Sequence, residues 1–343
     1  MTTSQELMAR FAERTGLTGT RPQRRYLWTD AFAVCNFLGL GQDDRATALV
    51  AAVHRELGRH RADDTRRGWI SGLPEADGAA HPTFGGLRIG KPLQERGAAE
   101  PFDEQLEWER DGQYFHYLTK WMHALDRAGM TPWARELADV AYRRFVYQAR
   151  GGQRMYWKMS IDLMRPQVSS MGHHDPLDGY VTALQLDRGT GELADAIEDY
   201  RAMLDPHALA TGDPLGIGGL LVDAYRLTQL DRDRPLREAL LEAARVGLDH
   251  YLRQPDLQLS AERRLAFREL GLAIGLAAVE AMAAPGFTRF AHLREAITRF
   301  WLDDAHRSSR TYRGHEDISD VMLATCLAPD GYLVLRQAAS RLA

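Results

Sequence analysis

The apolar residues of this chain recur at helical spacing, and the helical segments come in pairs. The alternation typical of strands is almost absent. After a short N-terminal helix, short connections join six pairs of predicted helices, at residues 28–40 and 43–60, 111–128 and 132–149, 176–187 and 191–204, 214–230 and 234–252, 261–283 and 287–303, and 318–328 and 331–342. This pattern predicts an all-α fold built from helical hairpins.

Within each pair the first helix carries fewer charges than the second, as a comparison of AFAVCNFLGL with RATALVAAVHRELGRHR shows. A helix that is apolar nearly all round is buried, whereas a one-sided helix lies outside. We therefore expect a single (α/α)6 barrel over residues 1–343, with six inner and six outer helices. An open solenoid is the alternative, but it would show more uniform repeats and polar terminal caps.

Two connections between hairpins, residues 61–110 and 150–174, are long. Loops of this length inside a compact domain are usually functional or disordered. These contain several aromatic residues, so we expect them to be ordered walls or lids over one face. We also expect a strand within residues 154–162 to pair with part of 84–93.

Bulk composition excludes several classes of protein. The net charge is -4 without a basic surplus, which argues against nucleic-acid binding. Cys35 and Cys326 are too few for a disulfide scaffold. Charges interrupt the first 16 residues, and no stretch has ~18 uncharged apolar residues. We expect a cytoplasmic protein with no membrane partner; its oligomeric state is not determined by the sequence.

One motif occurs twice. Residues 172–178 and 314–320 both read G-H-x-D-x-x-D before an apolar helix. Hairpins three apart face each other in a six-membered ring, so the two motifs would lie on opposite walls of one funnel. The motif residues that we select as catalytic candidates are His173, His174, Asp175, His315 and Asp317, with Glu316 as a substrate-binding candidate.

Helix capping is the simpler explanation for the acids of this motif. Asp175 and Asp317 would be N-caps, and the acids three residues later would occupy the capping-box position. Capping does not explain the histidines. Asp30, Asp111 and Glu262 also stand near the starts of inner helices, where acids favour the helix dipole. In a closed ring these acids would converge, which suits a hydroxylated ligand.

Aromatic residues are expected on the same rim. Flat aromatic faces suit sugar rings, although core packing is the commoner role for any one of them. The remaining substrate-binding candidates are Tyr26, Trp28, Trp108, Tyr114, His116 and Trp157.

The helix pairs, with acids, histidines and tryptophans at inner-helix starts, resemble the six-hairpin glycosidase-like superfamily over residues 28–342. The resemblance implies carbohydrate chemistry on a small sugar-like substrate. A glycoside hydrolase would use Asp111 or Asp175 as the acid and Asp317 as the base. A sugar 2-epimerase would instead use His173 or His174 facing His315. We rank the hydrolase first.

Two other classes stay open. A metal-dependent lipid- or prenyl-type enzyme with a double ring of helices would use the histidines and acids of the repeated motif, but these lack tight zinc-motif spacing. A non-enzymatic helical scaffold would show an exposed apolar groove and no converging acids. The sequence predicts neither a metal nor a cofactor.

Overall fold

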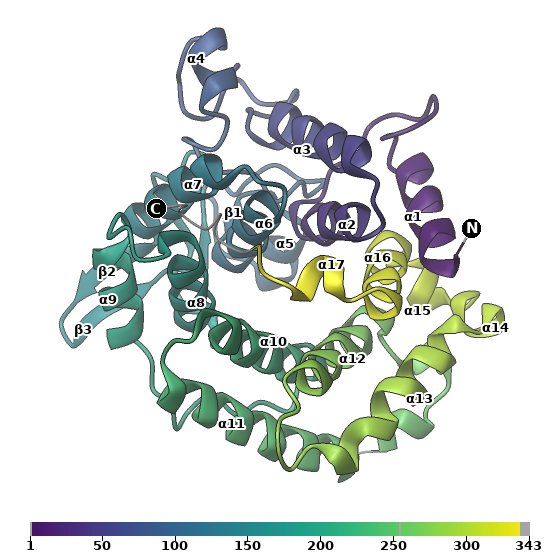
Figure 1. The fold of residues 1–343 in the computed structure, drawn as a ribbon. Helices are drawn as coiled ribbons and strands as arrows, with labels where there is room; N and C mark the ends of the chain where they lie inside the picture. Colours follow the sequence, from purple (N-terminus) through teal and green to yellow (C-terminus); the bar gives the residue numbers. More distant parts are fainter. Residues whose placement is uncertain (1, 254, 337–343) are drawn as a thin grey trace, which may run out of the picture. The chain divides into compact units, whose positions relative to one another are not determined.

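The computed structural model describes residues 2–253 and 255–336, which are predominantly helical (Figure 1). The helices are α1 (Thr3–Arg14), α2 (Leu27–Gly39), α3 (Asp43–Leu57), α4 (Glu75–Ala80), α5 (Glu104–Glu109), α6 (Phe115–Arg127), α7 (Thr131–Phe145), α8 (Asp175–Asp187), α9 (Ala194–Ala202), α10 (Pro214–Leu230), α11 (Arg234–Arg253), α12 (Ala266–Ala281), α13 (Ala291–Leu302), α14 (Asp304–Arg307), α15 (Arg310–Arg313), α16 (Glu316–Leu327) and α17 (Asp330–Leu333). Short 3-10 turns lie at Pro255–Gln258, Ala261–Arg263 and Thr288–Phe290. The all-α prediction is confirmed; the closed six-membered ring stays a prediction. Within the described ranges, no helix has the length and apolarity needed to cross a membrane.

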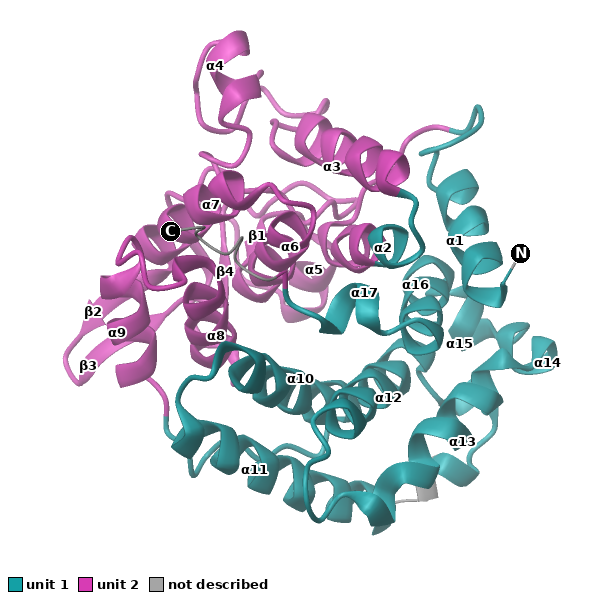
Figure 2. Ribbon diagram, viewed as in Figure 1, with its two compact units in different colours: residues 1–21, 36–42, 205–335 teal, residues 22–35, 43–204, 336–343 magenta. Residues whose placement is uncertain are grey.

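The chain divides into two compact units (Figure 2). Unit 1 comprises the described parts of residues 1–21, 36–42 and 205–335. Unit 2 comprises residues 22–35 and 43–204 together with the described part of 336–343. Each unit is built from helices that bury one face against a neighbour.

In unit 2, α6 packs on α7, α8 packs on α9, and α6 also contacts α8. Phe115 of α6 meets Phe145 of α7 with ring centroids 5.4 Å apart, and both side chains are buried. Trp121 of α6 is also fully buried. Burying each such side chain contributes roughly 1.5–3 kcal/mol, which fixes α6 against its neighbours.

In unit 1, α10 packs on α11, α12 packs on α13, and α10 contacts α12. The last contact is close because glycines face each other. A Cβ atom on Gly275 would lie 2.6 Å from the Gly218 Cα, and one on Gly218 would lie 2.2 Å from the Gly271 carbonyl oxygen. Any side chain at these positions would push the two helices apart.

Helix α1 packs on α16, which also contacts α12 and α13 in unit 1. The buried face of α1 includes Leu7, Met8 and Phe11, and the Ser4 hydroxyl donates to the Ala324 carbonyl at 3.2 Å. The sequence predicted residues 331–342 for this place. That prediction is wrong for the described residues, because α17 ends at Leu333 and the Leu335 N–H donates to the Gln229 side chain. Residues 337–342 lie outside the described part.

Short strands occur where the sequence predicted helix or other pairing. Helix α7 ends at Phe145, and β2 (Val146–Ala149) forms an antiparallel hairpin with β3 (Gly152–Met155). Strand β4 (Lys158–Met159) pairs with β1 (Gln113–Tyr114) and β5 (Pro166–Val168), not with residues 84–93 as expected. The β1–β4 pairing sets the backbone entering α6 beside the long segment 150–174.

Candidate functional site

The candidate site lies in unit 2, where the N-terminal ends of α6 and α8 meet. Asp175 is the first residue of α8, and His116 is the second residue of α6. The His116 Nδ1 lies 3.6 Å from the Asp175 Oδ1. The Asp175 side chain is only 6% exposed, whereas that of His116 is 27% exposed.

Burial changes the protonation of both groups. It raises the pKa of Asp175 to about 8, and the negative charge of Asp178 adds to the rise, while Lys120 and the Gly172 backbone oppose it. Burial lowers the pKa of His116 to about 4. At neutral pH the pair therefore consists of a protonated carboxyl and a neutral imidazole. A carboxyl that keeps its proton at neutral pH can act as a general acid.

One oxygen of this carboxyl is left without a partner. Asp175 Oδ2 is buried and has no hydrogen-bond partner among the described residues. Gly172 lies against it, since a Cβ atom there would be 2.4 Å from Oδ2. Buried polar atoms are nearly always hydrogen-bonded, so an unpaired oxygen here indicates a place for a ligand atom or water.

A second carboxyl follows one turn along α8. Asp178 is largely buried, and its Oδ1 accepts from the Lys120 Nζ at 2.9 Å. Lys120 is four residues after His116 on α6, so both side chains point the same way from that helix. Two carboxyls with different partners, one protonated and one paired with an ammonium, thus share one end of α8.

Aromatic rings lead from the surface to His116. Trp108 is 49% exposed and meets Trp157 edge to face, with centroids 5.1 Å apart. Trp157 is nearly parallel to His116, at 12° and 6.2 Å, and Tyr114 stacks on His116 at 5.4 Å. Of the aromatic candidates, Trp108, Tyr114 and Trp157 therefore gather with His116.

Tyrosines extend this aromatic group. The Tyr26 and Tyr117 hydroxyls lie 2.7 Å apart, and the Tyr117 ring contacts the rings of both Tyr114 and His116. Burial and the neighbouring tyrosines raise the pKa of Tyr117 well above its usual value. The Tyr117 hydroxyl thus stays protonated and able to donate near neutral pH.

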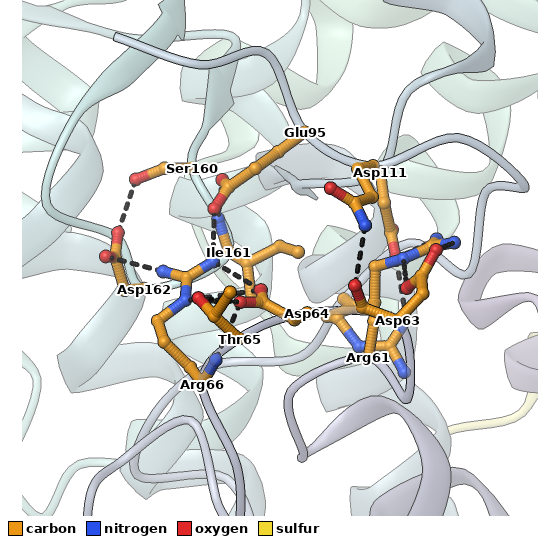
Figure 3. Close-up of polar contacts among 12 residues, drawn as sticks. Arg61, Asp63, Asp64, Thr65, Arg66, Glu95, Asp111, Ser160, Ile161 and Asp162 are labelled. Carbon is orange, nitrogen blue, oxygen red and sulfur yellow. Dashed lines mark hydrogen bonds and ion pairs between the residues drawn. The ribbon is translucent and has the colours of Figure 1, made fainter.

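Asp111 has a different environment (Figure 3). Its carboxylate accepts from Arg88 Nη1 at 2.6 Å, from Arg61 Nη1 at 3.4 Å, and from the backbone N–H groups of Gly90, Lys91 and Gly112. These five donors fill its acceptor sites and bind it to segment 61–93. The structure therefore places Asp111 where it holds segment 61–93 in place.

The two other candidates of unit 2 near the start of α2 have local partners. Trp28 is 6% exposed and packs on Phe32, with ring centroids 4.5 Å apart. The Asp30 carboxylate accepts from the Tyr26 N–H at 3.0 Å and from the Arg25 guanidinium at 3.3 Å.

The two histidines before α8 lie beside each other. His173 is exposed, and the centroid of its ring lies 4.5 Å from that of His174.

The remaining candidates belong to unit 1. Asp317 accepts from Arg14 Nε at 2.9 Å, and Glu316 lies 3.7 Å from the same guanidinium. His315 is exposed beside the Phe267 ring, and Glu262 accepts from the Arg310 N–H. The expected facing of the two G-H-x-D-x-x-D motifs stays a prediction.

The capping prediction for this motif is wrong. The residue at the N-cap of α8 is His174 and that of α16 is His315, so Asp175 and Asp317 lie one and two residues inside their helices. By contrast, Asp213 is the N-cap of α10, and its carboxylate accepts from the Gly216 N–H. The Asp175 carboxyl is thus not used for capping, and its burial needs another explanation.

Sequence reasoning did not select Lys120, Tyr117 or Gly172 for the site, nor Asp178 beyond its supposed capping role. Helical spacing carried a usable signal for two of them, since Lys120 follows His116 by four residues and Asp178 follows Asp175 by three.

Among the described residues, no group of three His, Cys, Asp or Glu side chains could hold a metal ion. Comparisons with protein-family models, curated proteins and solved structures find no match to this chain.

Proposed function

We propose that this chain is a cytoplasmic carbohydrate-active enzyme of the glycoside hydrolase type, with Asp175 as the proton donor. The observation that carries the proposal is the buried, protonated Asp175 carboxyl with its unpaired Oδ2. The aromatic group of Trp108, Trp157 and Tyr114 supports a sugar as the substrate, since flat rings pack against sugar faces.

The proposal includes the (α/α)6 arrangement of the six-hairpin glycosidase-like superfamily over a single domain. Its support is the pairing of α6 with α7, α8 with α9, α10 with α11 and α12 with α13, together with α1 on α16. In such an arrangement the starts of inner helices meet at one end, which is where Asp175 and His116 stand on α8 and α6.

In the proposed reaction, Asp175 gives its proton to the glycosidic oxygen while the bond from that oxygen to the sugar carbon breaks. The bonding electron pair stays on the departing oxygen, and water supplies the hydroxyl that the sugar carbon gains. The Asp178 carboxylate, held by Lys120, stabilises the positive charge that develops on the sugar. Activity should fall as the pH rises through about 8, because Asp175 then loses its proton.

The test compares the chain with Asp175→Asn on a panel of glycosides whose leaving groups differ in acidity. General acid catalysis contributes typically 10²–10⁴-fold, so kcat/KM for alkyl glycosides and small oligosaccharides should fall by about that factor. Dinitrophenyl glycosides should lose much less, since their leaving group departs without a proton. Asp139→Asn, an exposed acid paired with Arg143 on α7, is the control and should leave both rates unchanged.

Three results would contradict the proposal. Equal losses of kcat/KM in Asp175→Asn for glycosides with good and poor leaving groups would show that Asp175 is not the general acid. Absence of hydrolysis across the panel would remove the hydrolase. Uptake of deuterium from D2O at the second carbon of a free sugar would establish the epimerase instead.

A further inference from the structure

Asp175 has a restricted route to water. Its side chain is 6% exposed, and the Oδ1 lies 3.6 Å from the ring of His116, which is 27% exposed. A general acid must regain its proton after each reaction. A group this deeply buried regains it through whichever neighbour both titrates and touches solvent.

Several groups face Asp175. Asp178 on the same helix accepts from the Lys120 ammonium of α6 at 2.9 Å, so these two groups are engaged with each other. Tyr200 of α9 is buried, and burial with the nearby acids raises its pKa well above the usual value, so it does not exchange protons near neutrality. The Gly172 backbone does not titrate. His174 precedes Asp175 at the N-cap of α8 and is partly exposed. His116 meets both conditions, and its Nδ1 is the ring atom that the structure places 3.6 Å from the Asp175 Oδ1.

We propose that His116 is a positioning residue through which Asp175 exchanges its proton with solvent, with Oδ1 facing the imidazole and Oδ2 facing the substrate. This deepens the proposed function and rests on it. The geometry assigns a different role to each carboxyl oxygen of Asp175. Oδ1 is the oxygen near the His116 Nδ1, and Oδ2 is the oxygen without a hydrogen-bond partner.

The step balances without another reactant. After Asp175 has donated its proton, its negative charge raises the proton affinity of His116. The imidazole takes a proton from hydronium on one nitrogen and becomes imidazolium. It then passes a proton from Nδ1 to Asp175 Oδ1, which leaves a neutral imidazole, a neutral carboxyl and water. Rotation of the carboxyl group about its Cβ–Cγ bond then turns the protonated oxygen toward the substrate. Between pH about 4 and about 8 the pair then carries one proton in total.

The test is an NMR titration of the resting protein, which needs no substrate. With ring-labelled histidine, the His116 signals should show two inflections, near pH 4 and near pH 8, because each group senses the other. In Asp175→Asn the upper inflection should vanish. His173→Gln, a change to an exposed histidine two residues from Asp175, is the matched control and should keep both inflections.

A single His116 inflection that Asp175→Asn leaves unmoved would overturn the proposal. Should Asp175→Asn fail to fold, the Asp175 carboxyl carbon gives the same information. It should show two inflections in the wild type and one in His116→Gln; two in both would overturn the pairing.

On a substrate found by the glycoside panel, His116→Gln should lower kcat by roughly 10²-fold with KM little changed, and added imidazole buffer should restore part of the rate. A raised KM that imidazole does not restore would show that His116 binds the substrate, and it would contradict the proton relay. If no glycoside is hydrolysed but His116 and Asp175 titrate as a coupled pair, only the proposed function is contradicted. If glycosides are hydrolysed but the two groups titrate independently, only the proton relay through His116 is contradicted.

Discussion

Asp111 and Asp175 show how the same side chain acquires different behaviour from its neighbours. Both are buried in unit 2. Asp111 is surrounded by two guanidinium groups and three backbone N–H groups, which all donate hydrogen bonds to its carboxylate oxygens. Asp175 has an imidazole, a nearby anion and an unpaired oxygen, which favour the protonated form. A sequence shows two aspartates near helix starts and cannot distinguish them.

Stability should depend on pH through Asp175. Its folded-state pKa is raised to about 8, so the folded protein keeps a proton that the unfolded chain loses near pH 4, and stability falls as pH rises between these values. His116 acts oppositely below pH 6.5, since its folded-state pKa is lowered to about 4. The net loss should therefore appear between pH 6.5 and 8, with a slope approaching about 1.4 kcal/mol per pH unit.

Urea unfolding of the wild type and of Asp175→Asn at several pH values measures this slope. As the pH rises from 6.5 to 8, the free energy of unfolding of the wild type should fall relative to that of Asp175→Asn. Parallel curves would show that Asp175 does not hold its proton in the folded state.

Part of the candidate site could be predicted from the sequence. The motif G-H-x-D-x-x-D predicted Asp175. The expectation of aromatic residues on the same rim predicted Trp108, Tyr114 and Trp157, which do gather near His116. The contact between α6 and α8 could not be predicted, because α7 and the long segment 146–174 separate residues 116 and 175, and the path of that segment depends on tertiary packing. Solvent exposure and the unpaired oxygen are likewise properties of packing.

At the scale of elements, ion pairs join the two long segments 61–110 and 150–174 (Figure 3). The Arg66 guanidinium contacts Asp64 at 2.7 Å, Glu95 at 2.5 Å and Asp162 at 2.9 Å. Glu95 also accepts from the Ile161 N–H at 2.6 Å. Arg66 therefore links the two segments, and Arg96 adds a second link by donating to the Gln167 carbonyl at 2.7 Å. The expectation that these loops are ordered walls or lids stays a prediction.

Replacement of this arginine should loosen both loops. In Arg66→Ala, amide hydrogen exchange should rise in residues 61–66, 93–96 and 160–165, while α6 and α8 stay protected. Because Arg66 is partly exposed, the loss of global stability should be only about 1 kcal/mol. Arg67→Ala is the control, since Arg67 is exposed and its guanidinium donates to the neighbouring Arg66 carbonyl. Unchanged exchange in 160–165 would show that the bridge does not hold the second loop.

Over the whole chain, periodicity predicted most helices but not all of their partners. The starts of α8 and α10 at prolines follow from local chemistry. The partner of α16 was assigned to residues 331–342, because helices adjacent in sequence usually pack together. Helix α1 was recognised as a helix, yet its amphipathic face did not reveal which distant helix it covers.

The contact between α1 and α16 gives a prediction at this scale. Phe11→Ala on α1 should destabilise unit 1 by about 3–5 kcal/mol, because Phe11 is 1% exposed and its loss leaves a cavity. Amide protection in α16 should fall with it, as measured by hydrogen exchange. Glu13→Ala, on the exposed face of the same helix, should change stability by less than about 0.5 kcal/mol. Intact protection of α16 in Phe11→Ala would contradict the pairing.

The same contact determines when unit 1 can be completed during synthesis. Ser4 and Ala324 are 320 positions apart. A ribosome adds about 5–20 residues per second, so α1 waits between about 15 and 65 seconds for α16. During that interval the apolar face formed by Leu7, Met8 and Phe11 lacks its contacts with α16, although Asn36 of α2 can already reach the Met8 sulfur. This nascent segment is where a chaperone would act first, while residues 43–204 already have most of their native neighbours in unit 2.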